Sequence, residues 1–221
     1  MALAANHESS FAVREDGILL AWGNNEFGGL GTGDGVNTSV PRQVLWAGGE
    51  ARARQVSTRR KRTGIVTDTG DLFMCGKGNG GEIWVQVRAG SDLVAHDGDL
   101  PVVKTPTLVP RALFAGESVL MVTCGGDFTA VATEAGSVYT FGFGGDGALG
   151  HGDLDDQDLP RQVPPASFLN ERIVMVSAGH LHMVALSEGR RVYTWGNGEC
   201  FQLGDGGSEW QESPVQVWCL C

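Results

Sequence analysis

The sequence is poor in basic residues. Its 16 Lys and Arg residues are outnumbered by 26 Asp and Glu residues, which gives a formal net charge of −10. Sequence-independent binding to nucleic acid depends on Lys and Arg side chains that neutralise phosphates. Direct nucleic-acid binding is therefore disfavoured, and a protein partner, possessing basic groups, suits this surface better.

Long apolar runs and paired cysteines are also lacking. No apolar run approaches the roughly 20 residues that span a bilayer, so we expect no membrane insertion. The five cysteines show no C-x-x-C spacing and no secretory signal precedes them, which predicts an intracellular protein, cytoplasmic or nuclear. Cys219 and Cys221 form a lone C-x-C, for which a metal site is disfavoured.

Motifs of catalysis and cofactor binding are absent or incomplete. The sequence holds no G-x-S-x-G, H-E-x-x-H or P-loop pattern, so we predict no catalytic residues. Gly76–Gly81 and Gly142–Gly147 satisfy G-x-G-x-x-G, but no helical pattern follows either of them, and we predict no cofactor. His180 and His182 could share one face of a strand as metal ligands, yet no third ligand is evident and a structural role is favoured.

Glycine is abundant, with 34 residues, and much of it belongs to an internal repeat. In each copy a glycine that ends a short apolar strand is followed seven residues later by Leu or Ile. Such repetition predicts a fold made of similar units. The four copies read GILLAWG (17–23), GDLFMCG (70–76), GSVYTFG (136–142) and GRRVYTWG (189–196), and the apolar residues are Leu30, Ile83, Leu149 and Leu203.

Each copy contains several short strands, most clearly the third. Its predicted strands are Cys124–Ala132, Ser137–Phe141, Pro160–Val163 and Arg172–Ser177. The fourth copy ends after Pro214–Val217, so we expect its last strand to be missing. The glycine-to-proline distance is 18 residues in three copies but 34 in the second, which predicts an insertion at about 84–104.

Glycine turns, short strands and the lack of a 3.6-residue period predict an all-β fold of β-propeller blades, each with four antiparallel strands. We expect one propeller-type domain over residues 1–221. Its repeats are predicted at about 17–66, 70–132, 136–186 and 189–221, the last of them incomplete.

The repeat resembles that of the regulator of chromosome condensation family. The similarity is strongest in VSAGHLHMVALSEGRRVYTWGNGECFQLGDG (176–206) and GSVYTFGFGGDGALGHGD (136–153), and good in 17–34. The second copy departs from the pattern at Ile83-Trp84 and at Arg59–Arg62. The resemblance implies a seven-bladed propeller, so four blades predict a partial or fragmentary propeller that belongs to a larger chain or assembly. A closed four-bladed ring is the alternative.

The repeats, the acidic charge and the lack of a catalytic set favour a non-enzymatic protein-protein interaction or scaffold module. The resemblance implies two alternatives. One is guanine-nucleotide exchange on a small GTPase, and the other is the target-recruiting region of a larger ubiquitin ligase.

Two charged clusters supply candidate partner-binding residues. A basic run could be a nuclear-import signal or a phosphate-binding patch, or simply a solvated loop. An acidic loop could contact a basic partner or be solvated, and it lacks the ligand spacing of a calcium loop. The basic candidates are Arg59, Arg60 and Arg62, and the acidic-loop candidates are Asp146, His151, Asp153, Asp155 and Asp156.

Overall fold

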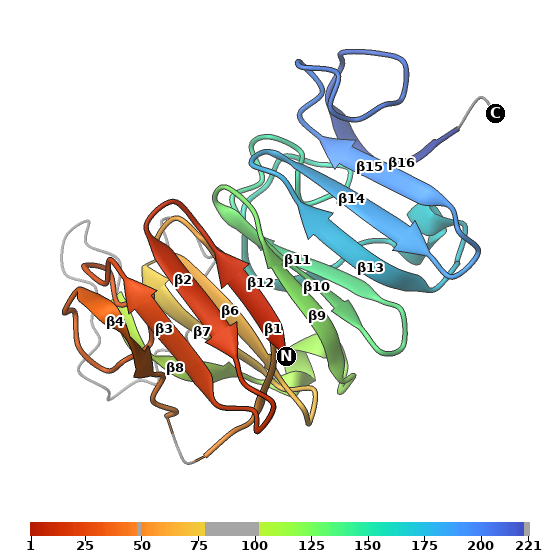
Figure 1. The fold of residues 1–221 in the computed structure, drawn as a ribbon. Coiled ribbons are helices and arrows are strands. Elements are labelled where there is room, and N and C mark those ends of the chain that lie inside the picture. The colour runs from red at the N-terminus through yellow and green to blue at the C-terminus, as the bar shows by residue number, and fades with distance from the viewer. Residues whose placement is uncertain (48–49, 78–101, 219–221) are drawn as a thin grey trace. The chain divides into compact units, whose positions relative to one another are not determined.

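A computed structural model describes residues 1–47, 50–77 and 102–218, and the regular secondary structure of these ranges is almost entirely β-strand (Figure 1). Their strands form four antiparallel sheets of four strands each, numbered here 1 to 4 in chain order. Sheet 1 contains β1 (Ala2–Ala5), β2 (Ser9–Val13), β3 (Leu19–Gly23) and β4 (Thr38–Gln43). Sheet 2 contains β5 (Ala53–Arg59), β6 (Arg62–Thr67), β7 (Leu72–Lys77) and β8 (Val102–Val109).

Sheets 3 and 4 repeat this arrangement in the C-terminal half. Sheet 3 contains β9 (Val119–Cys124), β10 (Phe128–Thr133), β11 (Val138–Gly142) and β12 (Gln157–Gln162). Sheet 4 contains β13 (Ile173–Ala178), β14 (His182–Ser187), β15 (Val192–Gly196) and β16 (Gln211–Val217). The short 3-10 helices η1 (Arg111–Phe114) and η2 (Pro165–Phe168) precede sheets 3 and 4.

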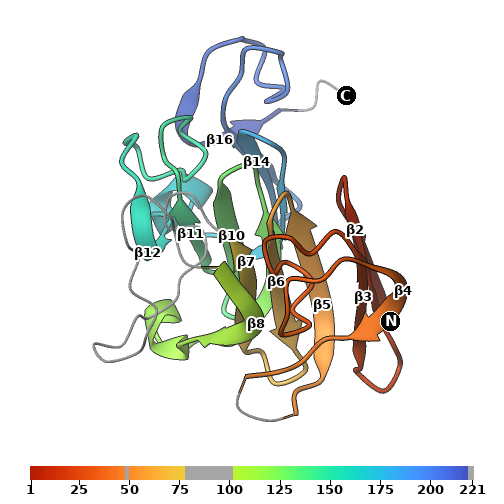
Figure 2. The same ribbon diagram turned by 90° about the vertical axis from the view of Figure 1, so that its left-hand side faces the viewer.

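In every sheet the strands lie side by side in chain order (Figures 1 and 2). This up-and-down order is that of a propeller blade and confirms the predicted fold class. The described residues fall into two compact units, one from Met1 to Pro110 with sheets 1 and 2, and one from Arg111 with sheets 3 and 4. Each unit has its own hydrophobic core.

Because successive strands run in opposite directions, the first turn and the long loop between the third and fourth strands lie at the same end of each sheet. We call this end the loop end. One backbone hydrogen bond joins turn and loop in every sheet, 2.9 Å long in each case. The donors and acceptors are Asn24 N–H to Glu8 O, Lys77 N–H to Lys61 O, Phe143 N–H to Asp127 O, and Asn197 N–H to Leu181 O.

This close approach explains the glycine at the end of each third strand. Gly23 has a φ of +117°, and a Cβ atom there would lie 2.2 Å from the Glu8 carbonyl oxygen. Gly196 has a φ of +100°, with its Cβ position 2.5 Å from the Leu181 oxygen. A Cβ atom of any other residue would clash with the first turn, so the recurring glycine is a steric requirement.

The apolar residue seven positions after that glycine fills the core. Leu30, Leu149 and Leu203 are each at most 1% exposed. Leu30 joins Phe11, Leu19 and other residues in the core of the first unit. The fourth residue of the series, Ile83, lies outside the described residues, as does most of the predicted insertion.

The sheet boundaries differ from the predicted repeat boundaries by one strand. Arg172–Ser177, predicted as the last strand of the third copy, overlaps β13, the first strand of sheet 4. Sheet 4 is therefore complete, and the prediction that its last strand is missing was wrong. Cys124–Ala132 is not one strand either, because a turn at Gly125, Gly126 and Asp127 separates β9 from β10.

Candidate interaction surface at the loop end

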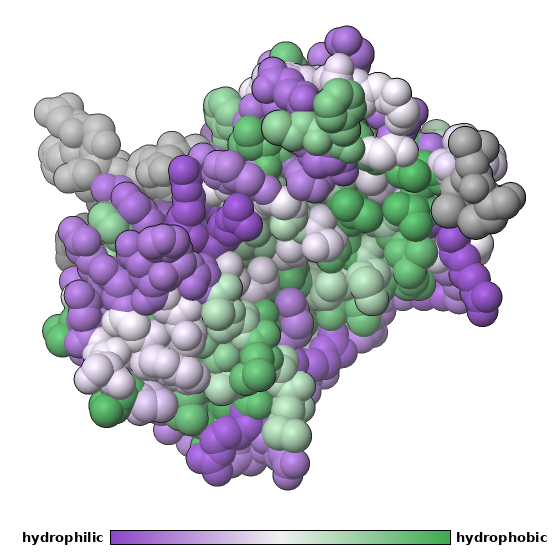
Figure 3. Space-filling view, turned by 45° about the horizontal axis from the view of Figure 1, so that its top comes forward, coloured by the Kyte–Doolittle hydropathy of each residue, from purple (hydrophilic) through white to green (hydrophobic). Residues whose placement is uncertain are grey.

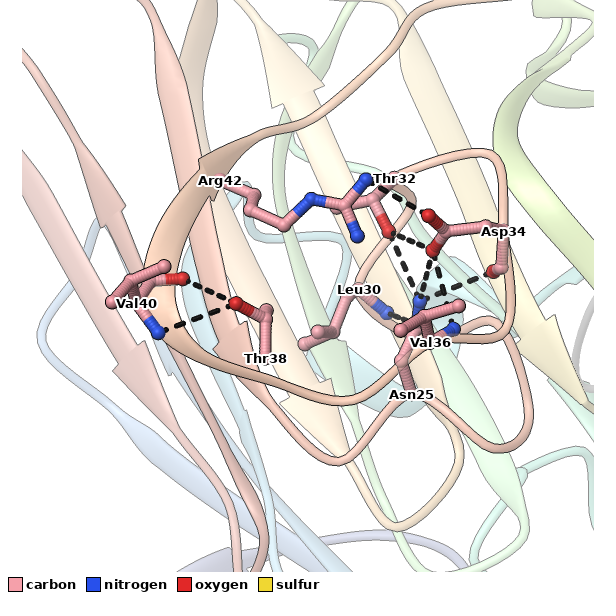
Figure 4. Close-up of polar contacts among 8 residues, drawn as sticks. All are labelled: Asn25, Leu30, Thr32, Asp34, Val36, Thr38, Val40 and Arg42. Carbon is pink, nitrogen blue, oxygen red and sulfur yellow. Dashed lines mark hydrogen bonds and ion pairs between the residues drawn. The ribbon is translucent and has the colours of Figure 1, made fainter.

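The long loop of sheet 1 is held by its own polar side chains (Figure 4). The amide nitrogen of the buried Asn25 donates to Thr32 Oγ1 (3.0 Å) and to Asp34 O (3.1 Å). Its Oδ1 accepts from the backbone N–H of Leu30 at 3.0 Å. Asn25 thus ties both sides of the loop together and replaces the water that its polar atoms lose on burial.

Asp34 closes the same loop through an ion pair with Arg42 of β4 (Figure 4). The Arg42 Nη2 to Asp34 Oδ2 distance is 2.8 Å. Hydrogen bonds from Arg42 and from Thr32 lower the pKa of Asp34 to about 2, because both favour the charged carboxylate. Asp34 is therefore ionised throughout the physiological range.

The acidic loop of sheet 3 contains the same device. Asp153 pairs with Arg161 at 2.9 Å, eight residues apart like Asp34 and Arg42. Asp156 accepts from the backbone N–H of Gly144 at 2.8 Å. Asp153 and Asp156 therefore stabilise the loop itself, and Asp155 is exposed between them.

His151 lies inside this loop and is only 8% exposed. Its Nε2 lies 2.9 Å from Thr140 Oγ1, while its Nδ1 is buried without a hydrogen-bond partner. Burial, and then the positive charge of Arg161, lower its pKa to about 4. The side chain is neutral at physiological pH and inaccessible, so its predicted contact with a partner is not supported by its position.

Asp146 belongs to a group of charged side chains at the loop end of the second unit. Burial raises its pKa, the charge of His180 opposes this rise, and the negative charges of Asp127 and Glu199 add to it. Glu199 and His180 are exposed, and Asp127 and Asp146 are half-buried. We call these four residues, Asp127, Asp146, His180 and Glu199, the acidic group.

The three arginines of the basic run do not form one patch. Arg62 is 2% exposed within β6, so the prediction of a surface role was wrong for it. Arg60 lies exposed in the turn before β6, with a φ of +50°, and Arg59 ends β5. The same turn carries Lys61, whose Nζ lies 3.8 Å from the centre of the Phe27 ring. The negative face of the aromatic ring attracts a cation placed over it.

The histidine pair and the glycine motif singled out in the sequence lie in turns and at a strand start. His180 lies in the turn between β13 and β14 and His182 begins β14, so the two do not share a strand as predicted. In the described ranges no three His, Cys, Asp or Glu side chains gather in a way that could hold a metal ion. Gly142–Gly147 leads into a turn and not a helix, and Cys219 and Cys221 lie outside the described residues.

The polar network of the loops was missed by sequence reasoning. Its signal was the repeated spacing of Asp34 and Arg42, and of Asp153 and Arg161, at the same place in two copies. The acidic group had no such signal, because Asp127, Asp146 and His180 come from three separate segments. Strand order places them at the loop ends of sheets 3 and 4, and the packing of these two sheets brings them together.

Four-stranded up-and-down sheets with glycine-rich loops define the chain as a β-propeller repeat protein. The profile of the regulator of chromosome condensation (RCC1) repeat matches residues 16–58 and 135–186, and a second profile of that repeat matches 173–202. The chain belongs to the RCC1 repeat family. No helix among the described residues has the length and apolar character needed to cross a membrane.

A relative agrees with this assignment, and solved structures share the fold. The chain is 33% identical over 217 residues to the ultraviolet-B receptor UVR8 of Arabidopsis thaliana, covering 97% of the chain and 45% of the receptor. The crystal structure of human WBSCR16 matches with a TM-score of 0.84 at 24% identity, covering 98% of the chain and 52% of WBSCR16.

A third match is Prp20p of Saccharomyces cerevisiae, whose crystal structure was described together with its binding to Gsp1p and histones. Its TM-score is 0.72 at 24% identity, covering 85% of the chain and 44% of Prp20p. At 24% identity, the crystal structures of WBSCR16 and Prp20p show that the chain shares their fold. The chain spans about half the length of these three proteins.

Proposed function

We propose that the chain is a non-enzymatic interaction module that binds a protein with basic side chains through the loop end of its second unit. The observation that carries this proposal is the acidic group. The loop that carries Asp146 is cross-linked by its own hydrogen bond and ion pair, so little conformational entropy of this loop is lost on binding.

The electrostatics of the acidic group favour a basic partner. Asp146 is partly desolvated, and Asp127 and Glu199 repel its negative charge. A Lys or Arg side chain from a partner would relieve this repulsion, and complementary charges also speed association. Prp20p, which binds Gsp1p and histones, offers two proteins with which to begin.

The test measures binding of the full chain to histones and to Gsp1p, with Glu199→Lys as the variant and Glu15→Lys as its matched control. Both residues are exposed and both substitutions change the charge by the same amount, but Glu15 lies in the turn between β2 and β3, at the opposite end of sheet 1. We expect Glu199→Lys to weaken binding roughly tenfold at low salt and Glu15→Lys to leave it unchanged. Equal effects of the two variants would refute the surface, and no binding of either protein would count against the partner class.

The same samples separate this proposal from guanine-nucleotide exchange. Release of bound nucleotide from Gsp1p is followed with and without the chain. Binding without faster release supports a scaffold, whereas acceleration supports the exchange alternative. Recruitment of targets for a larger ubiquitin ligase would use the same binding surface and needs a catalytic domain beyond these 221 residues. We keep a cytoplasmic or nuclear location as part of the proposal.

A further inference from the structure

Within the second unit, one face of sheet 3 is fully covered by sheet 4. Four side chains on that face are at most 2% exposed and belong to the same core cluster as the facing side chains of sheet 4. The Trp195 indole N–H adds a hydrogen bond of 2.9 Å to Ala148 O in the long loop of sheet 3. The covered residues are Phe128, Ala130, Ala132 and Val138, and the covering ones include Met183, Ala185, Tyr193 and Trp195.

The corresponding face of sheet 4 has no such cover among the described residues. Strand pairing places Leu186 between Met175 and Val192 on this face, and Val184 beside them. Met175 is 54% exposed and Val192 37% exposed. In the space-filling view, hydrophobic residues gather on the surface of sheet 4 beside the grey C-terminal residues (Figure 3). We call Met175, Val184, Leu186 and Val192 the free face of sheet 4.

The long loop of sheet 4 has glycines with positive φ at the positions where the loop of sheet 3 contacts the next sheet. Gly150 in the loop of sheet 3 has a φ of +77°, and its Cβ position lies 2.7 Å from Trp195 Nε1. The equivalent Gly204 has a φ of +67°, but its nearest neighbour, Val217 of its own sheet, is 3.8 Å away. Gly206, with a φ of +90°, has nothing within 4 Å. The glycines that make room for a neighbouring sheet are present in this loop, and among the described residues no other sheet contacts them.

The outer face of sheet 1 resembles the face of sheet 4 that packs against sheet 3. Trp22 precedes the glycine at the end of β3, as Trp195 does in β15. Trp22 pairs with Ser10, and Leu20 pairs with Ala12, which pairs in turn with Leu3 of β1. These residues alternate with Phe11, Leu19 and Ala21, which lie in the core, so they point away from it. Leu3 is 81% exposed.

We propose that the free face of sheet 4 binds the Leu3 and Trp22 face of sheet 1 in a second copy of this chain. The contact has the same form as the interface between sheets 3 and 4. In it, the Trp22 indole N–H of one copy would donate to Gln202 O of the other, as Trp195 donates to Ala148 O within the chain. It joins two different surfaces, so it is heterologous and leaves one of each surface free in a dimer.

The test measures the mass of the full chain by analytical ultracentrifugation over a concentration series. We expect the wild type to associate reversibly by about 100 µM, a weak affinity in the usual range of transient contacts. Met175→Glu disrupts the free face of sheet 4, and Leu3→Glu disrupts the opposite partner face. Each variant alone is expected to stay monomeric, with circular dichroism confirming that it is folded.

Mixing the two variants distinguishes a heterologous contact from other kinds of association. Met175→Glu keeps an intact sheet 1 face and Leu3→Glu keeps an intact sheet 4 face, so an equimolar mixture should form dimers and stop there. Leu169→Glu, an exposed position in the turn after η2, is the control and should associate like the wild type. A monomeric wild type, a mixture that stays monomeric, or variants that associate normally would each overturn the proposal.

The indole of Trp22 provides a finer readout. Trp22→Phe keeps an aromatic ring but removes the N–H donor, which should weaken association about three- to tenfold, the value of one hydrogen bond. An unchanged association constant would exclude the inferred bond to Gln202 O. Met175→Glu lies outside the acidic group and should leave binding to histones and Gsp1p unchanged, so failure of this contact and failure of the proposed partner-binding surface remain distinguishable.

Discussion

Cys75 in the first unit and Trp195 in the second occupy the same position, directly before the glycine that ends the third strand of sheets 2 and 4. In the second unit the Trp195 N–H donates to Ala148 O at 2.9 Å. In the first unit the equivalent acceptor, Gly29 O, receives a hydrogen bond of 2.8 Å from Thr63 and a weak one of 3.5 Å from Cys75. The main donor therefore lies on the third strand in sheet 4 (Trp195) but on the second strand in sheet 2 (Thr63), whereas the acceptor is the equivalent loop carbonyl in both cases.

The contact between a loop and the next sheet is therefore fixed by the loop carbonyl and not by one aromatic residue. A buried carbonyl needs a donor, and a hydroxyl on the adjacent strand meets this need as well as an indole does. The difference lies in apolar area, because tryptophan fills far more of the core than cysteine. The two units should therefore respond differently to matched substitutions.

The largest expected effect comes from truncating these side chains. Trp195→Ala should lower the free energy of unfolding by about 3–5 kcal/mol, because it removes a fully buried ring and leaves a cavity. Cys75→Ala should cost only about 1 kcal/mol, since the volume lost is small and Thr63 keeps the acceptor satisfied. Urea denaturation measures both values.

Hydrogen exchange then locates the loss, because the amides of sheets 3 and 4 should lose protection in Trp195→Ala while those of sheets 1 and 2 keep it. Thr63→Val is the matched polar variant. It preserves the shape but leaves Gly29 O with only the thiol, and it should destabilise the first unit by about 1–2 kcal/mol. A Cys75→Ala variant as unstable as Trp195→Ala would show that our account of the donor is wrong.

The second effect is a pH dependence confined to one unit. The first loop has Thr32 at the position that His151 holds in the third. Burial lowers the pKa of His151 from 6.5 to about 4, so the unfolded chain binds a proton more readily than the folded one. Stability is complete above pH 6.5 and falls as the pH drops toward 4, by up to about 3 kcal/mol at 1.36 kcal/mol per pH unit.

His151→Thr introduces the residue of the first loop and should remove this part of the acid sensitivity. Thermal unfolding of wild type and variant between pH 7 and pH 4 measures the difference. The two curves should diverge below pH 6.5 and run parallel above it. Curves that stay parallel down to pH 4 would mean that the folded protein accommodates a protonated His151.

Much of the fold could be predicted from the sequence, because its rules are local. The glycine and leucine offset predicts the buried Leu149 and Leu203, and Gly136 predicts the tight turn before β11. The assignment of strands to sheets could not be predicted, because nothing in Arg172–Ser177 shows whether it pairs backward or forward along the chain. The turn at Gly125 and Gly126 was hidden within an apolar segment.

The candidate site could be predicted only in part, because charge runs do not show which way a side chain points. Arg62 lies in a charged run of sequence, but the register of β6 buries it. Asp153 looked like a surface carboxylate, but Arg161 holds it in the loop. The acidic group comes from two turns and two long loops of sheets 3 and 4, which meet because the two sheets pack together, so sequence spacing carries no information about it.

The smallest effect concerns the two ion pairs that close the loops, Asp34 with Arg42 and Asp153 with Arg161. Burial opposes, and the hydrogen bond from Arg161 favours, the charged form of Asp153, with a lowered pKa as the net result. Asp34 also accepts a hydrogen bond of 2.9 Å from Thr32, whose place in the other loop is taken by His151. Arg42→Met should therefore raise the pKa of Asp34 from about 2 while leaving it below 3.8, because Thr32 remains.

Arg161→Met should return the pKa of Asp153 closer to that of a free carboxyl group, since no threonine replaces the lost donor. Titration of the carboxyl carbons by NMR measures both changes. Both groups are ionised when the unfolded chain is still protonated, so each pair stabilises the fold above about pH 4 and loses its effect as the pH falls through the folded-state pKa. The pairs are partly exposed and the loss of stability should be small. If Asp34 and Asp153 shifted equally, Thr32 would have no part in holding its carboxylate, and the loops of the two units would be electrostatically equivalent.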